Sequence, residues 1–252
     1  MHHQVIPVGN GVQDQASQPR PAKDRLCHHR ASQELEPWLA EQWTASPDGK
    51  VYTLTLRDGL QWSDGTPFTT ADVAFTAAAI ADPKAKSILT SALEVAGKPI
   101  TIATPDAKTV VVTLPEPFGP GLRFLDSVPI LPKHKLEGAL KAGEFAAAWP
   151  VTTPPADLAG MGPFRIAKYE AGQRVTLERN PHFWRKDDAG IQLPYLDGLV
   201  LEIVPDQDAE LLRLQSGQID LTQQQLRAQD YATARELEQK GVLTMMELGV
   251  GL

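Results

Sequence analysis

Few side chains in this 252-residue sequence are suited to chemistry, and the first group of them lies near its start. Cys27-His28-His29 combines a thiol with two imidazoles, and His3 completes an amino-terminal copper or nickel motif if Met1 is retained. A transition-metal site needs three or four ligands that a folded shell holds in place. The surrounding residues show neither strand nor helix periodicity, so we predict chance histidines, no metal site and no cofactor.

Two pairs of carboxylates, Asp206 with Asp208 and Glu34 with Glu36, are candidates for acid–base catalysis. Such a pair needs burial or a charged neighbour that shifts a pKa into the working range. Asp206 and Asp208 instead stand at the start of a helical pattern, where the helix dipole favours negative charge. We therefore predict a capping role for them and no catalytic role.

Two histidines, His134 and His182, are candidates for a general base. Neither has a serine or cysteine nucleophile on a strained turn nearby, of the kind that a Gly-x-Ser-x-Gly stretch makes. We predict surface or loop positions for both. Gly9-Asn10-Gly11 is not a phosphate loop, because no Gly-Lys-Ser or Gly-Lys-Thr follows it. The sequence thus predicts a protein that is not an enzyme.

The composition excludes several other classes of protein. The net charge is −7 and the chain has no stripe of Lys and Arg, so we predict no nucleic-acid partner. The longest apolar runs are as short as strands, so we predict no membrane insertion. One cysteine rules out an internal disulfide. The 42% hydrophobic and 22% charged residues are ordinary for a globular protein.

The first 34 residues are rich in Gln, Pro, His and Arg and carry no apolar run of the length that a secretory signal requires. They also lack a period of 2 or 3.6 residues. We predict a disordered or non-native leader over residues 1–34, with order beginning near Leu35.

The rest of the chain alternates strand, turn and helix signals. Thr69 followed by Asp72 predicts a capping box at a helix that ends before Pro83, and Asp206 or Asp208 predicts the start of another helix that ends at Gly217. We expect strands and hairpins at 51–56, 100–102, 110–114, 164–169 with 174–179, 199–204 and 219–221, and helices at 86–95, 135–148 and 226–239; residues 39–43 are helical or extended. This mixture is typical of an α/β or α+β fold.

Four groups of motifs stand in one order along the chain. They are Leu39-Ala40-Glu41-Gln42-Trp43 with Leu56-Arg57-Asp58-Gly59; Trp62-Ser63-Asp64-Gly65-Thr66-Pro67 with Asp72-Val73; Gly162-Pro163-Phe164 with Asn180-Pro181-His182-Phe183-Trp184; and Pro194-Tyr195-Leu196-Asp197 with Gln215-Ser216-Gly217-Gln218-Ile219-Asp220. Together they resemble family 5 of the extracellular solute-binding proteins, the peptide, opine and nickel binders of ABC importers. The Asp-Gly pairs and Asn-Pro are also scaffold residues, so these motifs indicate a fold and not a ligand.

The resemblance implies a periplasmic binding protein-like fold of type II, in which two lobes close over a solute. Residues 35–252 would supply part of the first lobe, with the second lobe absent. The implied partners are a peptide or other small solute and the permease subunits of an ABC transporter. The implied protein is a monomer in the periplasm or at the cell surface, although the chain shows no signal peptide.

Two segments approach the ligand by position in this family, although no motif fixes them. They are the loop around Phe124–Val128 and the segment Lys86–Ile88. The candidate ligand-binding residues are therefore Ser87, Asp126 and Ser127, and the alternative is an ordinary surface loop. The tryptophans at positions 38, 43, 62, 149 and 184 could stack on a ligand, but their size favours packing in the core.

Three hypotheses of function remain. The first is a non-enzymatic module that captures solutes for an importer. The second is a truncated, inactive remnant that binds nothing and exposes an unpaired sheet edge. The third, an enzyme that acts on a small polar substrate, rests on scattered carboxylates alone.

Overall fold

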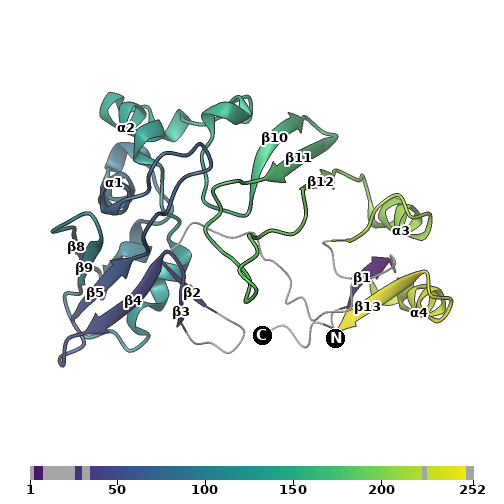
Figure 1. The fold of residues 1–252 in the computed structure, drawn as a ribbon, viewed down its shortest axis with the longest axis horizontal. Helices are drawn as coiled ribbons and strands as arrows, with labels where there is room; N and C mark the ends of the chain where they lie inside the picture. Colours follow the sequence, from purple (N-terminus) through teal and green to yellow (C-terminus); the bar gives the residue numbers. More distant parts are fainter. Residues whose placement is uncertain (1–2, 8–25, 30–34, 223–225, 248–252) are drawn as a thin grey trace. The chain divides into compact units, whose positions relative to one another are not determined.

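The computed structural model describes residues 3–7, 26–29, 35–222 and 226–247 (Figure 1). The chain forms two compact units. The larger unit comprises Arg20–Glu170 and Val175–Leu201, and the smaller unit comprises Met1–Pro19, Ala171–Arg174 and Glu202–Leu252.

The larger unit contains a four-stranded antiparallel sheet (Figure 1). Its strands, in the order β4-β5-β9-β8, are β4 Ala40–Ala45, β5 Val51–Leu56, β9 Thr109–Thr113 and β8 Thr101–Ala103. The alternation along β5 turns Leu54 and Leu56 inward, and Val110 lies opposite Leu54 in the register. The predicted strands are confirmed here, and residues 40–43 prove to be extended.

Two helices, α1 Thr70–Ala81 and α2 Lys133–Ala142, pack against each other in the larger unit. The predicted capping box is confirmed, because the Asp72 carboxylate accepts a hydrogen bond from the Thr69 N–H at 2.9 Å. The other oxygen of Asp72 accepts from the Lys133 N–H at 3.0 Å. One buried carboxylate therefore accepts a backbone N–H at the start of each helix.

The helix predicted over residues 86–95 is wrong. That stretch holds a left-handed residue, Lys86, with φ of 49°, followed by a short 3-10 turn and a two-residue strand. Side-chain bonds from Ser87 and Thr90 to nearby backbone groups compete there with helical pairing. The elements of this part are η1 Pro83–Ala85, η2 Thr90–Leu93, β6 Glu94–Val95 and β7 Lys98–Pro99.

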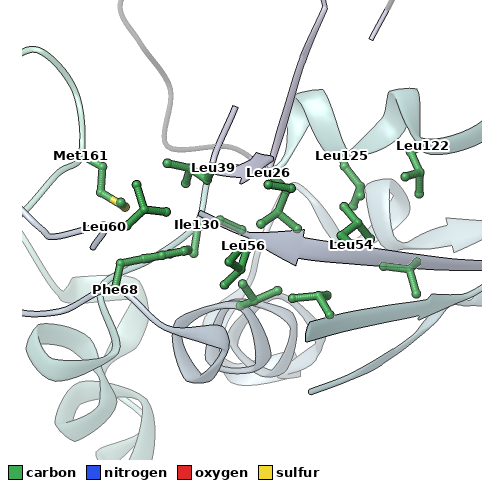
Figure 2. Close-up of a cluster of buried hydrophobic side chains, with 14 of the residues drawn as sticks. Leu26, Leu39, Leu54, Leu56, Leu60, Phe68, Leu122, Leu125, Ile130 and Met161 are labelled. Carbon is green, nitrogen blue, oxygen red and sulfur yellow. The ribbon is translucent and has the colours of Figure 1, made fainter. Parts of the chain in front are cut away.

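The main core of the larger unit contains a residue from the predicted leader (Figure 2). Leu26 is 1% exposed, and its carbonyl accepts a hydrogen bond from the Ala40 N–H at 2.9 Å. The following strand, β2 Cys27–His29, pairs with β3 Leu35–Pro37. The prediction that order begins near Leu35 is therefore wrong for residues 26–29 and also for residues 3–7, which form a strand, whereas residues 1–2, 8–25 and 30–34 lie outside the described part.

A three-stranded sheet follows in the order β10-β11-β12, with β10 Phe164–Glu170, β11 Arg174–Arg179 and β12 Gly198–Glu202. The predicted hairpin of β10 and β11 is confirmed. Gly198 allows the chain to pass close to β11, because a Cβ at this position would lie 2.6 Å from the Leu177 carbonyl oxygen. Short 3-10 turns complete the larger unit: η3 Gly121–Ser127, η4 Phe145–Ala147 and η5 Pro155–Asp157.

The smaller unit pairs β1 His3–Pro7 with β13 Leu243–Glu247 and packs α3 Gln207–Gln215 and α4 Tyr231–Gln239 around a small apolar cluster. The predicted cap is confirmed, since an Asp206 carboxylate oxygen accepts from the Ala209 N–H at 2.8 Å. The strand predicted at 219–221 is wrong, because these residues form a bend and coil. Residues before Tyr231 form the 3-10 turn η6 Ala228–Asp230.

Candidate functional site

The predicted ligand residues lie in two short segments of the larger unit. Ser87 is in the loop between η1 and η2, where its hydroxyl accepts a hydrogen bond from the Leu89 N–H at 3.1 Å. Its carbonyl accepts from the Thr90 hydroxyl at 3.0 Å. Asp126 and Ser127 are the last residues of η3, and their side chains lie outside the described part of the chain.

The elements beside these two segments pack together in space, although they are distant in sequence. The turn η2 contacts η3, and Ile80, Leu93 and Val128 form a buried cluster beneath them. Leu89 packs on the same cluster, so it holds the loop that carries Ser87. Ile88, next to Ser87, is 93% exposed, and its apolar side chain therefore faces solvent.

The space beneath the two segments is too small for a solute. A cavity of about 10 Å³ lies there, lined by Leu26, Val73, Thr76, Ala77, Leu93, Ile102, Leu125, Val128 and Ile130. A water molecule needs about this much room and two or more polar partners, and the lining is almost wholly apolar. The cavity is therefore a packing gap in the core.

Sequence reasoning missed the role of the two histidines. The predicted surface or loop positions are confirmed, because His134 lies at the surface and His182 lies in a turn, but the sequence did not show that each contacts the turn that follows Gln61. The His134 Nε2–H donates to Asp64 Oδ2 at 2.8 Å, and the His182 Nδ1–H donates to Gln61 Oε1 at 2.9 Å. The pairs are 70 and 121 residues apart in sequence, so no local pattern could have indicated them.

Asp64 has an unusual electrostatic environment for a surface turn. Burial by itself raises the pKa of this carboxyl, but hydrogen bonds from His134 and Thr66 outweigh that effect and hold the pKa well below its ordinary value. The Lys135 ammonium lies 3.3 Å from the same oxygen that binds His134. The turn thus presents a carboxylate to the first turn of α2.

The Asn-Pro-aromatic corner connects this turn to the sheet of β10. Asn180 is 1% exposed, its amide donates to the Gly162 carbonyl at 2.8 Å, and its carbonyl oxygen accepts from the His182 N–H at 2.9 Å. The rings of Trp38 and Trp184 meet edge to face, 5.3 Å apart. The Arg57 guanidinium covers Trp184 at 4.6 Å from the ring centroid.

The tryptophans favour the core interpretation over ligand stacking. Trp62 is fully buried, and Trp38, Trp43 and Trp184 are half-buried against the main core. Trp149 packs beside a second cluster formed around Phe75, Ala79 and Leu136.

The other candidates for chemistry have structural partners or lie outside the described part. Asp206 caps α3, and Asp208 forms an ion pair with Arg227. Among the described residues, no group of three or more His, Cys, Asp or Glu side chains is placed to hold a metal ion. The side chains of His3, Cys27, His28 and His29, and the whole of Glu34, lie outside the described part.

Comparisons with known proteins agree with the geometry. A family model described as "Bacterial extracellular solute-binding proteins, family 5 Middle" matches residues 34–250. A probable ABC transporter-binding protein of Deinococcus radiodurans is 32% identical over 73% of this chain and 32% of its own length. The periplasmic oligopeptide-binding protein OppA of Salmonella typhimurium is also 32% identical, over 74% of this chain and 34% of its own length.

The fold matches solved binding proteins as well. The oligopeptide-binding protein AppA of Bacillus subtilis, in complex with a nonapeptide, matches with a TM-score of 0.69 and 26% identity. The match covers 85% of this chain and 40% of that protein. The predicted mixed α/β fold of the type II periplasmic binding proteins is confirmed for this part of the family fold.

The extent of these matches bears on function. The chain spans about a third of the length of the curated relatives it matches. In the described part of the chain, no helix is long and apolar enough to cross a bilayer. The family model covers most of the chain, and the chain therefore belongs to family 5 of the bacterial extracellular solute-binding proteins.

Proposed function

We propose that this chain forms part of the first lobe of the solute-capturing component of an ABC importer, and that its cargo is a peptide or a similar small polar solute. The protein would bind and release the solute without catalysis, act outside the cytoplasmic membrane as a monomer, and deliver its cargo to permease subunits. The observation that carries this proposal is the family match over residues 34–250, with relatives named as peptide-binding proteins.

We further propose that the loop of Ser87 and the end of η3, with Asp126 and Ser127, form part of the surface that faces the solute. Two features support this assignment. Leu89, which follows the Ser87 loop, and Val128, which follows η3, belong to the same apolar cluster, and this supports a shared surface for the two segments. Ile88 is 93% exposed beside Ser87, and an apolar side chain in that position gains free energy if a bound solute covers it.

A chimera tests both proposals. Residues 35–247 would replace the matching segment of the Salmonella OppA, and isothermal titration with short peptides would measure affinity. For the chimera we expect micromolar dissociation constants, which correspond to a binding free energy of about −8 kcal/mol. We expect Ile88→Glu to weaken binding by about tenfold or more, because it places a charge where solute covers an apolar group.

Val151→Glu is the matched control, because Val151 is also highly exposed, at 79%, but lies outside the two segments. Equal affinity in both variants would refute the assignment of the segments. A folded chimera that binds no peptide would refute the peptide cargo.

The 252-residue chain by itself is expected to bind peptides poorly, because one lobe encloses little of a solute. Micromolar binding by the chain alone would contradict this expectation. Sedimentation equilibrium tests the proposed monomer, and a defined dimer mass would refute it.

A further inference from the structure

The turn from Gln61 to Pro67 is closed by its own bonds and leaves one carboxylate oxygen for a partner. Gln61 bridges to Pro67, and the Gly65 N–H donates to the Trp62 carbonyl at 2.8 Å. Asp64 Oδ1 accepts from the Thr66 N–H at 3.0 Å. Asp64 Oδ2 remains for α2 and accepts from His134 at 2.8 Å.

A second imidazole, that of His182, contacts the same turn but has an uncharged partner. Its Nδ1–H bonds to the amide oxygen of Gln61 at 2.9 Å. The ring lies against Gly65, where a Cβ would be 3.3 Å from its Nε2. The turn therefore offers a direct comparison between a histidine that faces a carboxylate and one that faces an amide.

Protonation affects these two contacts differently. The Asp64 carboxyl, whose pKa is held well below its ordinary value, stays ionised in neutral and weakly acidic solution, so His134 faces a full negative charge there. An imidazolium that donates to a carboxylate makes a charge-assisted hydrogen bond, which is stronger than the neutral one. When the acceptor is an uncharged amide oxygen, protonation of the imidazole strengthens the hydrogen bond much less.

Other charges near His134 limit this gain. Lys135 shares the Asp64 oxygen, and several other charged groups of the neighbouring elements have partners of their own. The pairs are Lys133 and Lys141 with Glu137 on α2, Arg165 with Glu178 on the β10 hairpin, and the Asp72 carboxylate of α1 with the Lys133 N–H. The side chains of His134 and Asp64 are about a quarter exposed, at 26% and 23%. Solvent therefore screens the pair in part.

We propose that the contact between Asp64 and His134 is a pH-sensitive latch, which holds the start of α2 to the turn Gln61–Pro67 more tightly as the surroundings become acidic. The turn also binds the start of the β10 sheet: the Ser63 N–H donates to the Gly160 carbonyl at 2.8 Å, and Arg165 donates to the Ser63 carbonyl at 3.1 Å. The latch thus couples α2 to β10 through one short turn. A protein outside the cytoplasmic membrane meets the pH of its environment directly.

Urea unfolding of the full chain at pH 5 and pH 8, followed by tryptophan fluorescence, tests the latch. The variants are His134→Gln and, as the matched control, His182→Gln. His134→Gln should raise the unfolding equilibrium constant at both pH values. We expect the ratio of the variant's constant to that of the wild type to be about three- to fivefold larger at pH 5 than at pH 8. For His182→Gln, we expect the ratio of the unfolding constants of variant and wild type to be no larger at pH 5 than at pH 8. Equal ratios at the two pH values for His134→Gln would overturn the proposal.

Two further measurements isolate the contact between Asp64 and His134 from other titrating groups. In an Asp64→Asn background, the effect of His134→Gln should become independent of pH, and an unchanged pH dependence would overturn the latch by assigning the effect to another group. Hydrogen exchange of the Gly65 and Thr66 amides in the wild-type chain requires no variant to fold. After correction for the intrinsic exchange rates, their protection should be greater at pH 5, and equal or lower protection would overturn the latch. No ligand is involved, so these outcomes are independent of the proposed transport function.

Discussion

Replacement of Asn180 by alanine should destabilise the larger unit more than most polar substitutions would. The side chain is 1% exposed and makes two hydrogen bonds, one to the Gly162 carbonyl and one from the His182 N–H. The backbone N–H of Asn180 bonds to the Pro163 carbonyl and its own carbonyl to the Phe183 N–H, and alanine can keep both. The substitution therefore removes the side-chain contacts selectively.

The expected magnitude follows from the two groups that lose their partner. Each part-buried backbone group left without a hydrogen bond costs about 1–2 kcal/mol. We therefore expect Asn180→Ala to lower the free energy of unfolding by about 2–4 kcal/mol. That is a large fraction of the roughly 5–15 kcal/mol that stabilises a typical domain.

The assay is urea unfolding monitored by tryptophan fluorescence. All five tryptophans lie in the larger unit, so the signal reports the unit that contains Asn180. Gln42→Ala is the control, because Gln42 is an exposed amide side chain on β4 of the same unit. We expect the control to change the free energy of unfolding by less than about 0.5 kcal/mol. If the two variants differ by less than this amount, the buried hydrogen bonds of the corner do not stabilise the unit as argued.

Three further predictions concern the same unit. Asp72→Ala removes the acceptor of both the Thr69 and Lys133 N–H groups and should lower the free energy of unfolding by about 2–3 kcal/mol. Hydrogen exchange of the Lys133 amide should become faster, and unchanged exchange there would contradict the shared cap. Leu93→Ala should cost about 2–4 kcal/mol and broaden the NMR signals of the Ser87 loop, and sharp, unshifted loop signals would show that the cluster does not hold it. Because folding lowers the pKa of Asp64, its stabilisation is complete above the unfolded pKa of about 4 and is lost as the pH falls through the folded value. Asp64→Asn should therefore flatten the acid limb of a stability–pH curve, and an unchanged limb would refute this.

The relation between the family motifs and the fold explains why the sequence indicates a family more readily than a ligand. The Asp64-Gly65 turn and the Asn180 corner meet through His182, and Asn180 bonds the loop that leads into β10. These residues build the scaffold of the larger unit. The Gln215-Ser216-Gly217 helix end lies in the smaller unit, where Gly217 has a φ of 68° that suits glycine. None of these motifs contains Ser87, Asp126 or Ser127.

Local features were determined by the sequence alone. The capping box of Thr69 and Asp72, the hairpin around Gly172, the cap at Asp206 and the order of the family motifs could all be predicted. In each of the structural cases the interacting groups lie within a few residues of one another, so the pattern of residue types carries the answer.

The tertiary structure decided whatever depended on a distant partner. Leu26 is buried because it meets the core and the Ala40 N–H, although its own surroundings resemble a leader. The stretch after Lys86 is not a helix, because side-chain bonds and packing against η3 outweigh its helical pattern. His134 and His182 reach one turn from positions 70 and 121 residues away from their partners. Long-range packing selects one of several conformations that each segment could adopt locally. Those long-range contacts exist only in the folded chain, so a single sequence does not reveal them.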